Sequence, residues 1–320
     1  MTRLRFSYVF LFQIILGSSV ATFAKPIVVN VADTFSINWT NNKEATSSQR
    51  VKSFHENVVP QFPEFYKYRF NTLKKQARDV GQEIVRHFDE FSEISIEFSK
   101  LSKELPTNLE NAILSFSERF KDFDSNFKIY LIHSLDEMDG GVRTVGDQEF
   151  FIFGLESMIK FHNFSNRTPF FHHELFHLYH FQVRKAEFRE ELWEYLWIEG
   201  LATYMSHVLN PTATYIDLAL DVPEGLVNKC EKNFPDIIEA LLASFDSKSP
   251  EVYAKFFLPN ANDEIIPSRA AYYIGYLLAK EIAKTAAPAT LVNLGGDALK
   301  LQLRKALQQL LRTHQNESHF

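Results

Sequence analysis

The feature that most constrains this chain is a histidine-rich stretch, residues 172–180, with the sequence His-His-Glu-Leu-Phe-His-Leu-Tyr-His. It contains the pattern H-E-x-x-H, in which His173 and His177 lie four positions apart. On an α-helix this spacing places both side chains on one face, so two imidazoles can bind a single cation. Glu174 lies about 100° further round the helix, from where its carboxylate can reach a water on that cation. The stretch therefore predicts a helix with a metal site, and neutral imidazoles favour zinc.

The same pattern is also compatible with a histidine-rich amphipathic helix whose imidazoles bond to carbonyl groups of the core. A third ligand distinguishes the two, because zinc hydrolases use three protein ligands and leave one position open. Glu199, in the apolar stretch 192–204, is the candidate, since a buried carboxylate is unfavourable unless it is paired or bound to a metal. Gly200 beside it would let a neighbouring segment approach closely. His180, three positions beyond His177, fits better as a group that supports a ligand or faces solvent.

Residues 197–204, Trp-Ile-Glu-Gly-Leu-Ala-Thr-Tyr, resemble the W-L-N-E-G-F-A-x-Y stretch that follows H-E-x-x-H in the gluzincin zinc metallopeptidases. The similarity is closest to the membrane-alanyl-aminopeptidase and leukotriene-hydrolase-like group. The resemblance implies one zinc ion per chain, with His173, His177 and Glu199 as its ligands. It also implies that Glu174 is the general base.

The resemblance covers residues 168–208 and has two departures from that group. Twenty-one residues separate His177 from Glu199, more than in that group, so the connecting loop differs. Thr203 stands four positions after Glu199, where the thermolysin branch has an acidic residue that orients a ligand histidine. The partner of the histidine N–H group is therefore not identified from the sequence.

A second similarity lies at residues 272–275, Tyr-Tyr-Ile-Gly, which match the Tyr-x-x-Gly of the aminopeptidase group. The resemblance implies that the hydroxyl of Tyr272 donates to the oxyanion that develops on the substrate carbonyl. Tyr273 is the alternative donor. Both tyrosines are also compatible with ordinary helix packing, because aromatic stripes are common in protein cores.

The N-terminal residues have the pattern of an export signal. Two arginines precede an apolar run, residues 6–16, and small residues lead to Ala21 and Ala24, where cleavage is reasonable. An N-terminal membrane anchor is the alternative, but the run is shorter than the ~20 residues that span a bilayer. We therefore expect residues 1–24 to be a signal peptide and the mature protein to be secreted or periplasmic, without a membrane span.

The composition limits the partners of the chain and the ways in which it is stabilised. A net charge of −6 without a basic stripe argues against nucleic acid and leaves a peptide or protein substrate as the expected partner. Cys230 is the single cysteine, so no intrachain disulfide can form. Roughly 295 residues beyond the signal are enough for one large or two modest domains.

Hydrophobic spacing predicts that most of the chain is helical. Residues 25–60 are polar and indicate irregular structure, whereas residues 63–98 have apolar side chains at helical intervals. Pro106 is expected to end that pattern and to precede a separate helix at 109–120. Further amphipathic helices are expected at 236–245, 270–284 and 298–311.

Two short runs predict strands between these helical regions. Residues 127–132 alternate, and residues 148–153 are aromatic and apolar, so both indicate strands of a small sheet. In zincins such a sheet precedes the metal helix, and its edge strand holds the substrate. We therefore expect an α+β, mostly helical fold, with an N-terminal helical region over 25–125 and a zincin-like catalytic domain over 126–320.

Together these features predict a secreted zinc-dependent metallopeptidase, in which Glu174 takes the proton of the attacking water. An aminopeptidase also needs a carboxylate for the substrate's α-amine, and residues 140–146 supply none, while Arg143 would repel an amine. Cleavage within peptide chains is therefore favoured. Two alternatives stay open: a catalytically inactive zincin-fold binding or effector module, and a zinc amide hydrolase that acts on non-peptide substrates.

Overall fold

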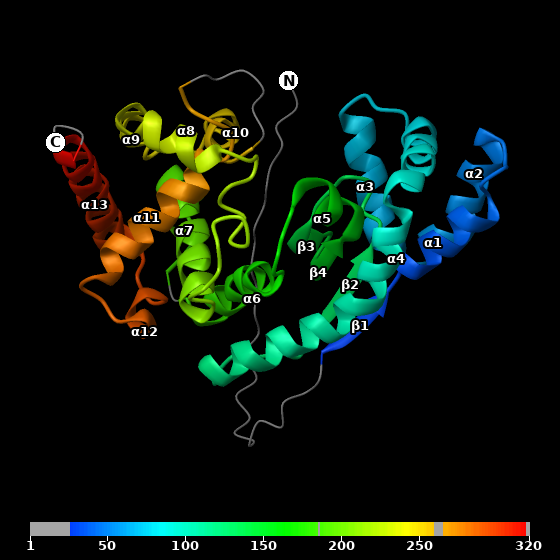
Figure 1. Ribbon diagram of the computed structural model, residues 1–320, viewed down its shortest axis with the longest axis horizontal. Helices are drawn as coiled ribbons and strands as arrows, with labels where there is room; N and C mark the ends of the chain where they lie inside the picture. Colours follow the sequence, from blue (N-terminus) through cyan, green and yellow to red (C-terminus); the bar gives the residue numbers. More distant parts are fainter. Residues whose placement is uncertain (1–25, 185, 259–264, 318–320) are drawn as a thin grey trace. The chain divides into compact units, whose positions relative to one another are not determined.

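The computed structural model describes residues 26–184, 186–258 and 265–317, and Figure 1 shows it as a ribbon. The predicted export signal, residues 1–24, lies outside this part of the chain. Among the helices that are described, none is both long and apolar enough to span a membrane.

The described residues form two compact units. The N-terminal unit comprises residues 26–118 and 124–162, and the C-terminal unit comprises residues 119–123 and 163–317. Each unit has its own buried core, and each is described separately below.

The N-terminal unit contains a small mixed sheet whose described strands have the order β1-β2-β4-β3. The strands are β1 (Ile27–Asn30), β2 (Lys128–Ile132), β3 (Gly140–Val145) and β4 (Gln148–Gly154). β1, β2 and β4 are parallel, and β3 is antiparallel to β4. β2 and β4 confirm the strands that were predicted at 127–132 and 148–153.

β1 and β3 were not predicted, and the irregular structure expected over residues 25–60 was wrong. β1 has four residues and pairs with β2, Val29 lying opposite Tyr130, so its partner is distant in the sequence and no local pattern reveals it. β3 contains glycines that indicate a turn. The turn itself lies between β3 and β4, at Gly146, whose φ of +63° suits a two-residue hairpin connection.

Helices pack against the strands of this unit, α1 on β2, α3 on β3 and α5 on β4. The helices are α1 (Ala32–Asn41), α2 (Ser47–Ser53), the π-helix η1 (Phe54–Val58), the 3-10 helix η2 (Val59–Gln61), α3 (Pro63–Lys75), α4 (Val80–Arg119) and α5 (Leu155–Phe161). Phe35 lies in the core between them, with its ring centroid 4.9 Å from that of Phe91 and 3.9 Å from that of His133.

α4 is continuous through Pro106, so the predicted break before a helix at 109–120 was wrong. A proline inside a helix has no N–H for the carbonyl four residues earlier, here that of Ser102. Asn30 replaces the missing donor, because its side-chain amide donates to the Ser102 carbonyl at 3.2 Å. The end of β1 therefore satisfies the backbone group that the proline leaves without a helical partner.

The C-terminal unit is helical in its described part, and α7 packs against both α6 and α11 (Figure 1). Its helices are α6 (Thr168–Val183), α7 (Leu192–Leu209), α8 (Leu226–Lys232), α9 (Phe234–Ala243), α10 (Pro250–Phe257), α11 (Ala270–Ala283), α12 (Pro288–Leu291) and α13 (Gly296–Glu317). α9, α11 and α13 confirm the helices that were predicted in this part of the chain. The fold class is α+β and mostly helical, with one small sheet among the described residues.

The strands of the sheet group by their contacts with the N-terminal helices. The reason is the pairing of β1 with β2 and the packing of α1, α3 and α5 on the strands, which together complete the core of the N-terminal unit. The domain bounds expected from the sequence, 25–125 and 126–320, stay a prediction.

Candidate metal centre

The predicted histidine pair lies on α6, and the predicted glutamate lies on α7. Proline in the first turn starts α6, and the apolar residues around the histidines are mostly buried, as expected: Phe170, Phe171, Leu175 and Phe176. α7 buries two tryptophans, Trp193 and Trp197, in the same core. Two helices that pack through large apolar side chains therefore hold the polar groups between them.

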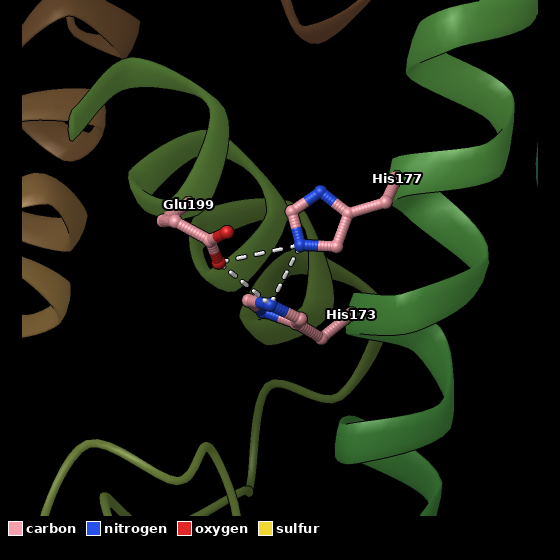
Figure 2. A group of neighbouring side chains, drawn as sticks. All are labelled: His173, His177 and Glu199. Atoms are coloured by element: carbon pink, nitrogen blue, oxygen red, sulfur yellow. Dashed lines mark hydrogen bonds and ion pairs between the residues drawn. The ribbon is translucent and has the colours of Figure 1, made fainter. Parts of the chain in front are cut away.

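Figure 2 shows His173, His177 and Glu199 with their side chains directed toward one another. The two Nε2 atoms are 2.9 Å apart, and each lies 3.3 Å from Oε2 of Glu199. The side chains are 13 %, 14 % and 19 % exposed, respectively. The structure thus brings together the three predicted ligand atoms in a partly buried cluster.

The separations of these atoms fit a zinc ion. Tetrahedral zinc with bonds of about 2.0–2.2 Å to nitrogen and oxygen keeps its ligand atoms about 3.3 Å apart. Both nitrogen–oxygen distances have that value, at 3.3 Å, and the nitrogen–nitrogen distance of 2.9 Å is slightly shorter. A small rotation of either imidazole would bring all three separations into the range for one ion.

Burial and charge shift the pKa values of the three groups in the cluster in different directions. Burial lowers the pKa of His173, and the positive charge of Arg269 acts in the same direction. Burial also acts to lower the pKa of His177, but the carboxylates of Glu199 and Glu174 outweigh it and raise that pKa. Burial opposes ionisation of Glu199, yet the two histidines hold its pKa well below the usual range. The carboxylate of Glu199 is therefore ionised at neutral pH.

Thr203 is the partner of a ligand histidine that could not be identified from the sequence. Its Oγ1 lies 3.2 Å from Nδ1 of His173 and donates to the carbonyl of Glu199 at 2.9 Å. Because the hydroxyl proton is used on that carbonyl, its oxygen accepts from the imidazole Nδ1–H. The proton on Nδ1 leaves the Nε2 lone pair directed at the cluster, which is the tautomer that binds metal.

Glu174 follows His173 on α6 and is partly exposed. Its negative charge contributes to the raised pKa of His177. Among the described residues it is not one of the three clustered ligand groups. That Glu174 reaches a metal-bound water without binding the metal stays a prediction.

α7 and α11 cross at two glycines next to the cluster. A Cβ atom on Gly200 would lie 2.2 Å from the carbonyl oxygen of Gly275, and a Cβ on Gly275 would lie 2.7 Å from that of Leu196. Gly200 follows Glu199 directly, which confirms the close approach predicted there. Gly275 is the glycine of Tyr-x-x-Gly, so the crossing places Tyr272 one helical turn from the level of Glu199.

The two candidate tyrosines have different surroundings. Tyr272 is partly exposed, and its ring packs against Phe257 with centroids 5.4 Å apart. Tyr273 is buried, and its hydroxyl donates to Glu231. Tyr273 is therefore a packing residue, whereas the role of Tyr272 stays a prediction.

His180 does not face solvent, which was one of the two expectations for it. Its side chain is 1 % exposed and packs against the rings of Phe176 and Phe181. Burial lowers its pKa to about 3, so the imidazole is neutral. The structure places it in the core of the C-terminal unit.

The loop that connects α6 to α7 is fixed to the first turn of α7. Arg184, just beyond α6, forms an ion pair with Glu194 at 2.5 Å, and both side chains are almost fully buried. Glu194 also accepts from the backbone N–H of Arg189. The loop between α6 and α7, which is longer than in the aminopeptidase group, is thus held by these contacts to Glu194.

Among the described residues one further group has the spacing of a metal site, namely His87, Glu90 and Asp136 in the N-terminal unit. The nitrogen and oxygen atoms that could bind a metal there already accept hydrogen bonds from Arg86 and Lys160. The cluster on α6 and α7 is therefore the better candidate for a metal centre.

Arg269 is a residue near the cluster that was not singled out from the sequence, because an arginine in a loop has no distinctive local signal. Thr203 had such a signal: it lies one turn after Glu199 on the same helical face, within reach of the ligands.

Comparison of the chain with protein-family models, curated proteins and solved structures gives no match. The geometry of the cluster therefore stands as the support for function.

Proposed function

We propose that this chain is a secreted zinc-dependent metallopeptidase with a zincin-type site, formed by His173, His177 and Glu199 on α6 and α7. The observation that carries the proposal is the convergence of two imidazole nitrogens and one carboxylate oxygen at separations of 2.9–3.3 Å. Thr203 supports it by holding His173 in the metal-binding tautomer. A histidine-rich packing helix would not need either feature.

A zinc ion held by these residues would supply a Lewis acid that lowers the pKa of water toward ~7 and polarises a carbonyl. Glu174 accepts the proton of the attacking water and delivers it to the leaving amine, because it follows the ligand His173 on α6 and is not itself one of the clustered ligand groups. Tyr272 donates its hydroxyl proton to the substrate oxyanion, a contribution of about 3 kcal/mol for donors of this kind.

Peptide bonds within a chain are the favoured substrate. No candidate carboxylate for an α-amine was found between residues 140 and 146. The expected substrates are therefore recognised away from a free N-terminus.

The test is a digest of a peptide library by the full chain, loaded with zinc, then stripped with a chelator, then reloaded. Activity that is lost and restored in this order supports the proposal. Glu174→Gln should keep about one zinc per chain and lose about 10²–10⁴-fold in hydrolysis, because an amide cannot accept the water proton. Glu239→Gln, on an exposed position of α9, is the matched control. Hydrolysis that survives both the chelator and Glu174→Gln would overturn the proposal.

A further inference from the structure

Arg269 has a guanidinium group without an acceptor among the residues that the structure describes. Its side chain is partly buried, and its Nε is buried without a hydrogen-bond partner. Among the described residues its charged end contacts an aromatic face, that of Tyr272, at 4.4 Å from the ring centroid. A contact with the face of a ring leaves the N–H groups of the guanidinium unused.

The backbone of Arg269 fixes this side chain at the start of α11. The residue is the N-cap of the helix and has φ 64° and ψ 14°, a left-handed conformation that is unfavourable for residues other than glycine. Tyr272, on which the guanidinium lies, is one turn further along the same helix. The side chain is therefore held by packing, although its donors have no partner in the described residues.

The metal cluster lies close to this guanidinium. α11 crosses α7 at Gly200 and Gly275, directly beside Glu199. Arg269 begins the helix six residues before that crossing, which is about 9 Å along the helix axis. The positive charge of Arg269 is also felt at His173. A substrate that reaches the cluster therefore meets a cation with free donors.

A carboxylate is the group that such a cation fits best. The planar guanidinium presents parallel N–H donors that match the two oxygens of a carboxylate. A partly buried cation whose buried Nε–H has no acceptor is unfavourable, and an incoming anion would satisfy both its charge and that donor. The N-terminus of α11 also carries the positive end of the helix dipole, which favours negative charge.

We propose that Arg269 binds a carboxylate of the substrate beside the metal centre, so that the enzyme selects peptides with an acidic group close to the scissile bond. This inference rests on the proposed function. The carboxylate has two sources, the C-terminus of a peptide or the side chain of an aspartate or glutamate, and both offer the same chemistry.

The test uses zinc-loaded full chain and pairs of peptide hydroxamates, which bind zinc and are not cleaved. One pair differs by a C-terminal carboxylate or carboxamide, and the other differs by an aspartate or asparagine next to the hydroxamate. Calorimetry should give about ten- to hundredfold tighter binding of the acidic member in one pair, the range for hydrogen bonds to a charged partner. The pair that shows the preference identifies the source of the carboxylate.

Arg269→Met should remove this preference and keep the zinc. Arg269→Lys should retain a reduced preference, because the positive charge remains but the paired N–H donors of the guanidinium are lost. Arg312→Met, on an exposed position of α13, should leave it unchanged. Equal binding of both members in both pairs by the wild-type protein, or an unchanged preference in Arg269→Met, would overturn the inference. Failure of the proposed function is seen separately, as absence of zinc in metal analysis before any ligand is added.

Discussion

The two histidine and carboxylate clusters in the described residues have similar composition and spacing. They differ in whether their lone pairs already accept hydrogen bonds from cationic side chains. In the N-terminal unit, Arg86 donates to Glu90, Asp136 and His87 at 2.8–2.9 Å, and Lys160 donates to both carboxylates at 3.0–3.1 Å. Two permanent cations thus occupy the position that a metal ion would take.

Within the described residues, no lysine or arginine side chain forms an ion pair or hydrogen bond with the cluster in the C-terminal unit. Its imidazoles and the carboxylate of Glu199 face one another. The one hydrogen bond to an outside group, from Nδ1 of His173 to Thr203, is on the side away from the cluster. Proximity of ligand residues therefore does not identify a metal site unless their lone pairs are still free to bind the ion.

Removal of one carboxylate from each cluster should give the largest difference. Glu199→Ala should reduce bound zinc from about one per chain to under about a tenth, because zinc sites with two protein ligands are weak. Asp136→Ala should leave the zinc content unchanged. Metal analysis after gel filtration measures both. Equal zinc in the two variants would mean that the clusters had been assigned the wrong way round.

Removal of the Arg86 cation should lower the stability of the fold more than removal of a ligand histidine. Arg86→Met removes a cation that pairs with three carboxylates, those of Glu83, Glu90 and Asp136, and should reduce the free energy of unfolding by about 2 kcal/mol, discounted because Arg86 is about one third exposed. Urea unfolding of metal-free protein measures this. His177→Ala in the same assay should change stability by much less. A larger loss in His177→Ala would show that its cluster is a structural one.

Loss of the Thr203 hydroxyl should weaken the metal site without abolishing it. Thr203→Val keeps the shape of the side chain and removes the acceptor for His173 Nδ1–H, so zinc affinity should fall about 10–100-fold. Thr203→Ser should retain most of the affinity. Competition with a zinc-binding dye measures the affinity of both variants. Equal affinity in wild type and Thr203→Val would show that Thr203 does not hold His173 in the metal-binding tautomer.

Acid should weaken the N-terminal cluster at a pH that can be stated. Burial opposes ionisation of Asp136, but the charges that surround it hold its pKa at about 2. Above about pH 3 His87 is neutral, because burial lowers its pKa to about 2, so the cations that act on Asp136 there are those of Arg86 and Lys160. A depressed pKa stabilises the fold above the unfolded value of about 3.9, and this stability is lost as the pH falls toward 2.

The expected contribution of Asp136 is about 1–2 kcal/mol in the free energy of unfolding. Urea midpoints between pH 5 and pH 2 should fall less steeply in Asp136→Asn than in wild type. Glu239→Gln, which changes an exposed glutamate, is the control. Parallel curves for Asp136→Asn and wild type would show that other groups cause the acid sensitivity.

What could be predicted from the sequence follows the range of the interactions involved. His173, His177 and Glu174 lie within one helical turn and a half, so their spacing was visible, and the apolar frame of Glu199 indicated a third member. β1 was missed because its four residues depend on pairing with β2, far along the chain. The break expected at Pro106 was wrong because Asn30, equally distant, supplies the missing hydrogen bond.

Side-chain partners across helices were the second limit. The hydrogen bond between Thr203 and His173 and the free donors of Arg269 depend on how α6, α7 and α11 are packed. A sequence pattern can place residues on one face of a helix, but it does not give the partner on the next helix. The candidate site was thus predicted as a set of ligands, and its surroundings came from the structure.

The contact of Gly200 with Gly275 also has a consequence for how this sequence can vary over evolution. Any side chain at either position would overlap backbone atoms of the other helix, so neither glycine can be replaced in a single mutational step without moving a helix. This selection acts on the crossing and is independent of catalysis. Descendants that have lost Glu199 should therefore still have both glycines, and an alignment of relatives in which the glycines vary while Glu199 is invariant would contradict this.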